Sequence, residues 1–121
     1  MQHVVNPLNS AGNIAYVIDS FDCRSILNSC RANNVPALAI RAVQAGALTS
    51  KVDRELAADD NDQLDFDRAV GFRELASEWE QTPARLAHRY ALSTSDLVSV
   101  ILGVKNREEL QECLNADLRR N

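Results

Sequence analysis

The sequence predicts one α/β domain across residues 1–121, built from parallel strands that alternate with helices. Two observations predict it. Short runs of consecutive apolar residues, typical of strands buried on both faces, recur along the chain. Between them, apolar residues return every three or four positions, as they do along one side of a helix. Such alternation favours a parallel sheet with right-handed crossover connections.

The N-terminal part is expected to form a strand, a loop and a helix. Val4 and Val5 are the first apolar run, and residues 9–13 have the composition of a loop. A helical pattern then extends over residues 20–34. Its apolar side, spaced i, i+3, i+4 and i+7, consists of Cys23, Ile26, Leu27 and Cys30. We expect this side to pack in the core.

The second predicted strand covers residues 35–40, which are apolar without interruption. Pro36 fits only near the start of a strand. A turn at residues 44–46 ends the strand, and the polar, acidic residues 50–63 are expected to form a surface loop with at most one helical turn.

Two helices are predicted next. The first covers residues 65–81, and its apolar side consists of Ala69, Phe72, Leu75, Ala76 and Trp79. The second begins with Thr82 as N-cap and Pro83 at its first position, a strong start signal. Its buried side consists of Leu86, Ala87, Tyr90 and Ala91. His88 lies beside that side and is expected to be partly exposed.

The last predicted elements are a strand over residues 98–102, ended by Gly103, and a closing helix. Asn106 is a suitable N-cap, and Glu109 follows three residues later, as in a capping box. The side of this helix that should face inward consists of Leu110, Cys113 and Leu114.

Composition narrows the function classes. The net charge is −4 and the isoelectric point about 5.1, which argues against a nucleic-acid surface and against a helix-turn-helix DNA reader over residues 82–103. The three cysteines are odd in number and form no CxxC motif, which favours free thiols in a reducing cytoplasm over disulfides or a metal site. No apolar run approaches the ~20 residues that cross a bilayer, and the N-terminus does not resemble a secretory signal.

Four segments carry a family resemblance, namely residues 2–7 (QHVVNP), 39–49 (AIRAVQAGALT), 75–76 (LA) with 82–93 (TPARLAHRYALS), and 99–110 (SVILGVKNREEL). Together they resemble the aldo-keto reductase family. Residues 2–7 (QHVVNP) are similar to its sixth barrel strand, in which Gln precedes a short strand ending in His-Pro or Asn-Pro. Residues 39–49, which end in Gly-Ala-Leu-Thr, are similar to the seventh strand and its loop. Leu75-Ala76 followed by residues 82–93 is the third segment, and residues 99–110 are similar to the eighth strand, the cofactor loop and the closing helix. The segments follow family order and spacing over almost the whole chain.

The resemblance implies a partial (β/α)8 TIM barrel, namely its C-terminal three strands with their helices. A complete barrel needs about 250 residues. The family's catalytic Asp, Tyr, Lys and His lie on earlier strands, and the Asp and Tyr stand five residues apart. Here the residues five before Tyr16 and Tyr90 are Ala11 and Arg85, so that pair is absent. A gene fragment, a truncated chain and a natural half protein all fit this pattern.

The resemblance also implies a site for NADP(H), or less favourably NAD(H). Gln2 would stack on the nicotinamide ring, Gly46 and Ala47 would let the backbone approach the pyrophosphate, and Lys105 and Arg107 would hold the 2′-phosphate. The full set of cofactor-binding residues is Gln2, Arg41, Gly46, Ala47, Gly103, Val104, Lys105, Arg107, Glu109, Glu112 and Cys113. No catalytic residue and no metal ligand are assigned.

Two of these residues depart from the family pattern. Glu109 stands where relatives often carry Arg or Gln, and a carboxylate there would repel a phosphate. Cys113 stands where relatives often place the Asn that meets adenine, whereas Glu112 matches the family Glu. These departures weaken the preference for NADP over NAD.

The function implied by the resemblance is oxidoreductase chemistry, the transfer of a hydride between NADP(H) and a carbonyl or alcohol substrate in the full barrel. The alternative is a non-catalytic half-barrel that binds nucleotide or acts as a subunit-interaction module. Open sheet edges, with Leu38, Ile40, Val100 and Leu102 expected to share an uncovered face, predict self-association.

Overall fold

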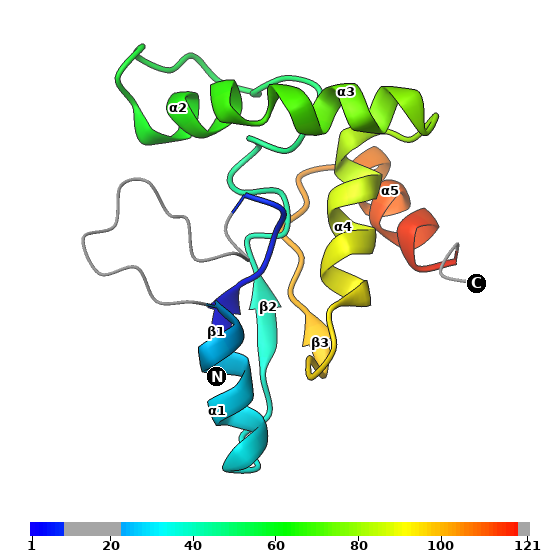
Figure 1. Ribbon diagram of the computed structural model, residues 1–121. Helices are drawn as coiled ribbons and strands as arrows, with labels where there is room; N and C mark the ends of the chain where they lie inside the picture. Colours follow the sequence, from blue (N-terminus) through cyan, green and yellow to red (C-terminus); the bar gives the residue numbers. More distant parts are fainter. Residues whose placement is uncertain (9–22, 119–121) are drawn as a thin grey trace.

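The computed structural model describes residues 1–8 and 23–118 (Figure 1). Its elements, in chain order, are β1 (Gln2–Val4), α1 (Cys23–Ala32), β2 (Leu38–Ile40), α2 (Asn61–Arg68), α3 (Val70–Glu78), α4 (Pro83–Ser93), β3 (Ser99–Val100) and α5 (Arg107–Leu118). The predicted loop at residues 9–13 and the predicted helix start at Ser20 lie outside the described residues.

The three strands form one parallel sheet in the order β1-β2-β3, as the alternating pattern predicts. Gln2 pairs with Leu38, and Leu38 pairs with Ser99. The described sheet is open, with β1 and β3 at its two edges. A short, open parallel sheet with intervening helices is consistent with part of a barrel.

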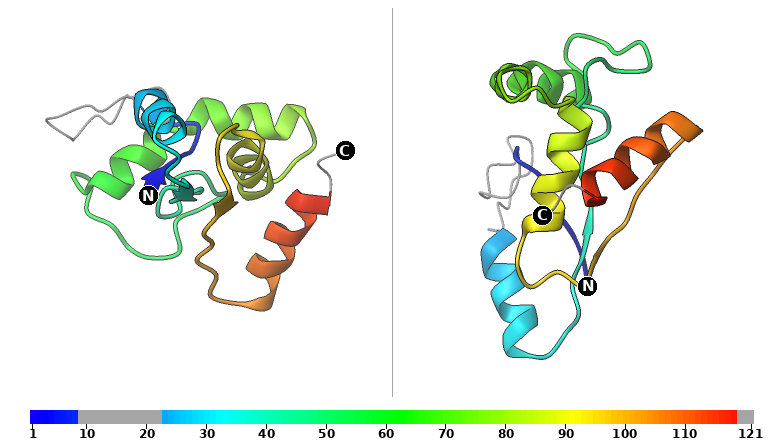
Figure 2. Two further views of the ribbon diagram at one scale, coloured as in Figure 1. Left: turned by 90° about the horizontal axis from the view of Figure 1, so that it is seen from below. Right: turned by 90° about the vertical axis from the view of Figure 1, so that its right-hand side faces the viewer.

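The helices are arranged around this sheet in two groups. α1 and α4 lie on the same side of the strands, as the right-hand view of Figure 2 shows, and α5 packs against α4. α2 and α3 follow one another across the end of the sheet at which β1 and β2 terminate (Figure 1). The first part of the segment that follows β2 packs against these helices, because Leu48 is buried against Ala69 and Ala87.

The prediction of one helix over residues 65–81 is wrong. The chain forms α2 and α3 instead, divided at Ala69, whose backbone N–H reaches the carbonyl oxygens of both Asp65 and Phe66. α2 also begins earlier than predicted, inside the acidic stretch, because the Asp60 carboxylate accepts a hydrogen bond from the Asp62 N–H at 2.8 Å. An Asp N-cap of this kind stabilises a helix start typically by about 1 kcal/mol.

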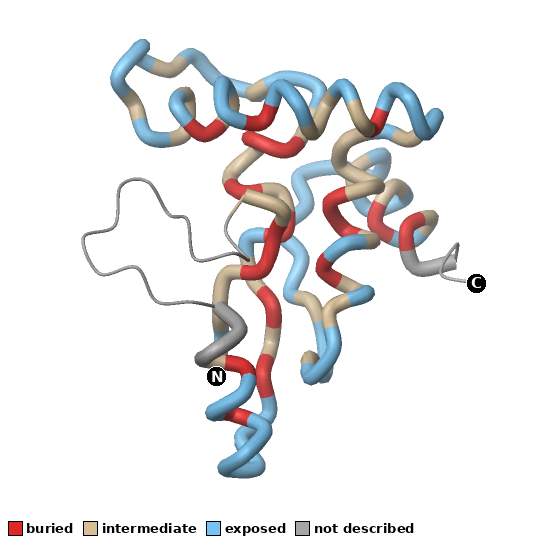
Figure 3. Tube along the Cα trace, viewed as in Figure 1, coloured by how far each residue is buried: buried red, intermediate tan, exposed pale blue. Residues whose placement is uncertain are grey.

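The core consists of two clusters of apolar residues, and buried positions follow the middle of the molecule in Figure 3. One cluster joins α1 to the sheet and contains Val5, Leu27, Cys30, Ala37 and Ala39. The other lies where the segment after β2 meets α3 and α4, and contains Leu48, Ala69 and Ala87, with Phe72 packed against it.

Several large residues predicted to be buried are exposed instead, namely Trp79, Tyr90, Leu110 and Leu114. On the same helices Ala69, Ala76, Ala87, Ala91 and Cys113 are buried. Helices that approach closely bury small side chains along a narrow contact line, and the larger neighbours beside it remain in solvent.

The predicted shared face of Leu38, Ile40, Val100 and Leu102 is also wrong. Val100 pairs with Ala39, and both belong to the cluster beneath α1. Paired residues of adjacent strands point to the same face and successive residues alternate, so Leu38 and Ile40 lie on the opposite face.

Candidate functional site

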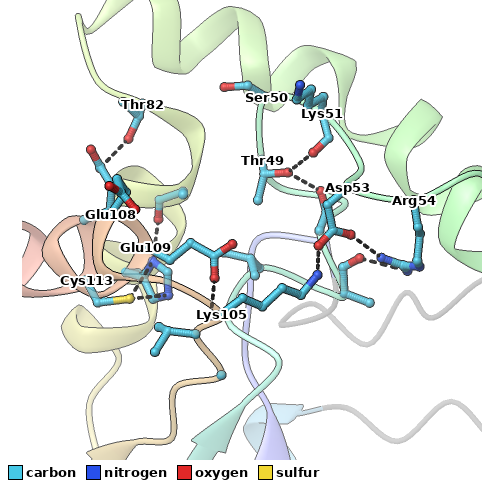
Figure 4. A pocket seen from close by; sticks show the side chains of 18 residues that line it. Thr49, Ser50, Lys51, Asp53, Arg54, Thr82, Lys105, Glu108, Glu109 and Cys113 are labelled. Carbon is cyan, nitrogen blue, oxygen red and sulfur yellow. Dashed lines mark hydrogen bonds and ion pairs between the residues drawn. The ribbon is translucent and has the colours of Figure 1, made fainter.

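A pocket of about 620 Å³ opens beyond the carboxyl ends of β2 and β3 (Figure 4). One wall is the segment after β2, from Val43 to Arg54, and the other consists of residues 103–113. The start of α4 contributes Thr82, Ala84 and His88. Ligands of parallel α/β proteins bind at this end of the strands, where the strand-to-helix loops meet.

The segment after β2 has an unusual backbone. Arg41, Gln44 and Ala45 adopt positive φ angles of 57°, 50° and 52°, and Gly46 follows at 93°. Each non-glycine residue in this left-handed region costs roughly 1–2 kcal/mol. Such a conformation persists only where the surroundings determine it.

Side chains of this segment and of other elements hold this backbone in place. The Asn6 side chain donates to the carbonyl oxygen of Arg41 at 2.9 Å. Arg54 donates to the carbonyl oxygen of Ala45 at 3.2 Å, and Arg73 donates to that of Ala47 at 3.1 Å. The Thr49 hydroxyl donates to the carbonyl oxygen of Gly46 at 2.6 Å. The pocket wall is therefore held by Asn6 and Arg73 from outside the segment and by Thr49 and Arg54 from within it.

A buried chain of polar groups supports the same wall. The Asn6 amide donates to Gln44 Oε1, and Gln44 Nε2 donates to Asp65 Oδ2, each at 3.0 Å. The other Asp65 oxygen pairs with Arg68 at 3.0 Å. Asn6, Gln44 and Asp65 are at most 1% exposed, so each of these bonds satisfies a group that water does not reach.

The opposite wall begins α5. Asn106 caps this helix, because its side-chain oxygen accepts from the Glu109 N–H at 2.9 Å. The Glu109 carboxylate accepts from the Lys105 N–H at 2.7 Å, one residue before the partner expected in a capping box. The protein's own carboxylate thus occupies the position at a helix N-terminus that suits an anion.

Charged side chains meet across the pocket. Lys105 Nζ is ion-paired with Asp53, which places a bond between the two walls in Figure 4. Arg54 pairs with Asp53 at 3.1 Å and with Asp62 at 2.5 Å. Among the lining residues, three basic side chains face four acidic ones: Lys51, Arg54 and Lys105 against Asp53, Glu108, Glu109 and Glu112.

Glu112 of α5 contacts the start of α4 beside the pocket. Its carboxylate accepts from the Thr82 hydroxyl at 2.8 Å and pairs with Arg85 at 3.5 Å. Thr82 is also the predicted N-cap of α4, since its hydroxyl oxygen accepts from the Arg85 N–H at 3.2 Å. The Thr82 hydroxyl group therefore both caps α4 and contacts Glu112 of α5.

His88 is buried, contrary to the prediction that it is partly exposed. The neighbouring α5 covers it, and Cys113 Sγ lies 3.4 Å from His88 Nε2. Burial lowers the pKa of His88, against opposing effects of the Ala84 carbonyl and Glu112. Burial, followed by Glu109 and Glu112, raises the pKa of Cys113. Both groups are therefore neutral near pH 7.

The structure brings together seven of the residues assigned to the cofactor, which line the pocket: Gly46, Gly103, Val104, Lys105, Glu109, Glu112 and Cys113. The other four do not line it. Gln2 is an exposed residue of edge strand β1, Ala47 is buried behind the wall, and Arg41 pairs with Asp62 at 4.0 Å. Arg107 is exposed at the first position of α5.

Sequence reasoning missed the pocket residues Lys51, Asp53, Arg54 and His88. The first three lie in a stretch whose polar composition indicates only a surface loop. Among the residues that the structure describes, no group of three or more His, Cys, Asp or Glu side chains is placed to hold a metal ion. None of the helices it describes is long and apolar enough to cross a membrane.

A parallel sheet with crossover helices and a pocket at the carboxyl ends of its strands defines an α/β protein and is consistent with part of a barrel. The model of the aldo/keto reductase family matches residues 2–118, and the chain belongs to this family. Membership implies the TIM-barrel fold, oxidoreductase function and a nicotinamide cofactor. A search of curated proteins found no match to the chain.

Proposed function

We propose that this chain supplies the cofactor-binding part of an oxidoreductase, and that its pocket binds a nicotinamide dinucleotide, NADP(H) in preference to NAD(H). The observation that supports this most directly is the convergence of Gly46, the Gly103–Lys105 backbone and the Lys105 ammonium group on one pocket at the strand ends. Its volume of about 620 Å³ lies within the range of roughly 300–1,000 Å³ typical of small-molecule sites.

Each wall has a role in this proposal. Gly46 leaves the backbone bare where a diphosphate would approach, and Lys105 would exchange Asp53 for a phosphate group. Glu112 and Cys113 would meet the adenosine end, and Gln2 and Arg41 would contribute only after the cofactor extends beyond the pocket. The bound dinucleotide supplies the hydride, while this chain holds and orients it.

The test is a calorimetric titration of the chain with NADPH and with NADH. Saturable binding of NADPH, tighter than that of NADH, is the expected result. Absence of binding for both nucleotides at millimolar concentration would refute a cofactor role for the pocket.

We also expect no carbonyl reductase turnover by this chain in isolation. General acid catalysis needs a proton donor positioned within hydrogen-bond reach of the substrate, and the sequence lacks the family's Asp-Tyr pair. The measurement is NADPH oxidation with a generic aldehyde, with an intact aldo-keto reductase as positive control. Turnover that survives further purification of the chain would contradict this expectation.

The open sheet favours a second candidate function, subunit interaction. β1 and β3 are edge strands, and Ile101 and Leu102, directly after β3, are each 41% exposed. Unpaired strand edges beside apolar side chains invite pairing with another chain. We expect the purified protein to self-associate, giving an elution volume in size exclusion that depends on concentration. A monomer at every concentration would exclude this candidate.

A further inference from the structure

We propose that Arg73 is a positioning residue for the pocket, which holds the turn around Gly46 in the shape that receives the phosphate groups of a dinucleotide. Arg73 belongs to the first half of α3 and does not line the pocket, so it acts through the backbone of the wall. The effect on affinity rests on the proposed nucleotide-binding function. The effect on the turn is measurable without nucleotide.

The guanidinium group of Arg73 bonds two backbone carbonyl groups in different segments. Nη1 donates to the carbonyl oxygen of Ala47 at 3.1 Å, and Nη2 donates to that of Phe66 at 2.7 Å. Phe66 belongs to the last turn of α2, where carbonyl groups lack partners within their own helix. Arg73 therefore ties the pocket wall to the break between α2 and α3.

A further contact fixes the orientation of this guanidinium group. Its central carbon lies 3.8 Å from the centroid of the Phe66 ring, where a planar cation is attracted to the ring face. A planar, forked group can stack on the ring and donate to both carbonyl groups at once, whereas a lysine ammonium group is a point charge on a flexible stem. The contacts are therefore specific for arginine.

The peptide group that Arg73 holds closes the strained turn of the wall. Its carbonyl belongs to Ala47, and its N–H belongs to Leu48, which donates to the carbonyl oxygen of Val43 at 3.1 Å. Residues 44–46, which lie between, all have positive φ angles. Because such a backbone persists only where its surroundings determine it, the bond from Arg73 helps to set the shape of the turn.

The same contact makes the turn more favourable for an anion. Carbonyl oxygens carry partial negative charge and repel a phosphate group that approaches them. Here the carbonyl oxygens of Ala45 and Ala47, on either side of Gly46, accept from the guanidinium groups of Arg54 and Arg73. Two positive charges are thus bound to the carbonyl groups that flank Gly46, which favours a negatively charged group beside it.

Apolar packing anchors the adjoining residue independently of Arg73. Leu48 is fully buried in a cluster with Ala69 and Ala87, and Phe72 packs against that cluster. Removal of the guanidinium group should therefore leave the core in place and release the turn, which separates a positioning role from a general loss of structure.

The first measurement is amide hydrogen exchange of the full chain without nucleotide, read by mass spectrometry. The amides of Gly46, Ala47, Leu48 and Thr49 all donate within the turn. We expect Arg73→Met to accelerate exchange over residues 43–49 at least about tenfold, with less than about a threefold change in α4. Unchanged exchange over residues 43–49 would overturn the positioning role.

The second measurement is calorimetric titration with NADPH, at a temperature where circular dichroism shows each variant to be folded. We expect Arg73→Met to weaken binding about tenfold and Arg73→Lys about threefold, because Lys keeps the charge but not the fork. Arg89→Met is the matched control and should bind as the parent does. Arg89 is also a half-buried helix arginine, donates to Gln81 at 3.4 Å and does not line the pocket.

The two measurements separate this inference from the proposed function. Failure of the parent to bind NADPH would refute the proposed function and the effect on affinity, while exchange still decides whether Arg73 holds the turn. If the parent binds and folded Arg73→Met binds equally tightly, or if Arg73→Met and Arg89→Met weaken binding equally, the positioning role is overturned. Arg73→Lys decides the same question if Arg73→Met does not fold.

Discussion

Replacing Gln44 by Leu should lower the free energy of unfolding by about 2–4 kcal/mol, the largest loss we expect from a single change in the pocket wall. Leu keeps the approximate volume but removes the link between Asn6 and Asp65. One oxygen of a buried carboxylate then loses its donor, and the Asn6 amide loses an acceptor. Unsatisfied buried groups cost about 1–3 kcal/mol each, and charged ones cost more.

The measurement is urea unfolding followed by circular dichroism. Gln111→Leu is the matched control, because it makes the same change at an exposed amide that bonds Asn115 within α5. We expect the control to stay within about 0.5 kcal/mol of the parent. Equal effects of the two substitutions would show that the buried chain of polar groups does not stabilise the fold.

Replacing Lys105 by Ala should weaken NADPH binding about 5- to 150-fold, which corresponds to a loss of about 1–3 kcal/mol for a charged hydrogen bond. The competing ion pair with Asp53 reduces this effect only slightly. Lys105 and Asp53 are 67% and 43% exposed, and exposed pairs contribute about 0–1 kcal/mol. A dianionic phosphate should therefore displace Asp53.

Arg107→Ala is the control for this variant. It removes the same charge two residues away, from a side chain that does not line the pocket. We expect a change of less than about threefold from Arg107→Ala, so the chain that carries both Lys105→Ala and Arg107→Ala should behave like Lys105→Ala alone. Glu109→Gln should act in the opposite direction and tighten NADPH more than NADH. If Lys105→Ala binds NADPH as tightly as the parent, the phosphate site has been misassigned.

The sequence predicts the order of elements well, because periodicity and end signals are local. The strand at residues 38–40 and the helix that starts after Thr82 both follow from patterns within a few residues. The break at Ala69 is not predictable in this way, because the nearest Gly lies two residues further on, inside α3, and Ala69 packs against Leu48 and Ala87, which are distant in the sequence.

The same difference between local patterns and long-range packing decides which parts of the site the sequence predicts. Gly46 and the Gly103–Lys105 segment follow from local motifs that resemble the family. The burial of His88 depends instead on α5 folding over α4, a contact between residues 25 positions apart. Likewise, three non-glycine residues of the segment after β2 adopt positive φ angles, which their residue types disfavour. Hydrogen bonds from the side chains of Asn6 and Arg54 hold them there.

The pocket assembles late in folding, because the segment after β2 is held by Asn6, Arg54, Asp65 and Arg73. These four residues belong to segments spread from the end of β1 to α3, so the wall gains its shape only once most of the chain is in place. Ligand binding should thus require the whole span from Asn6 to Arg73 to be folded. Local fraying at either end of this span would abolish the pocket before it exposed much of the core.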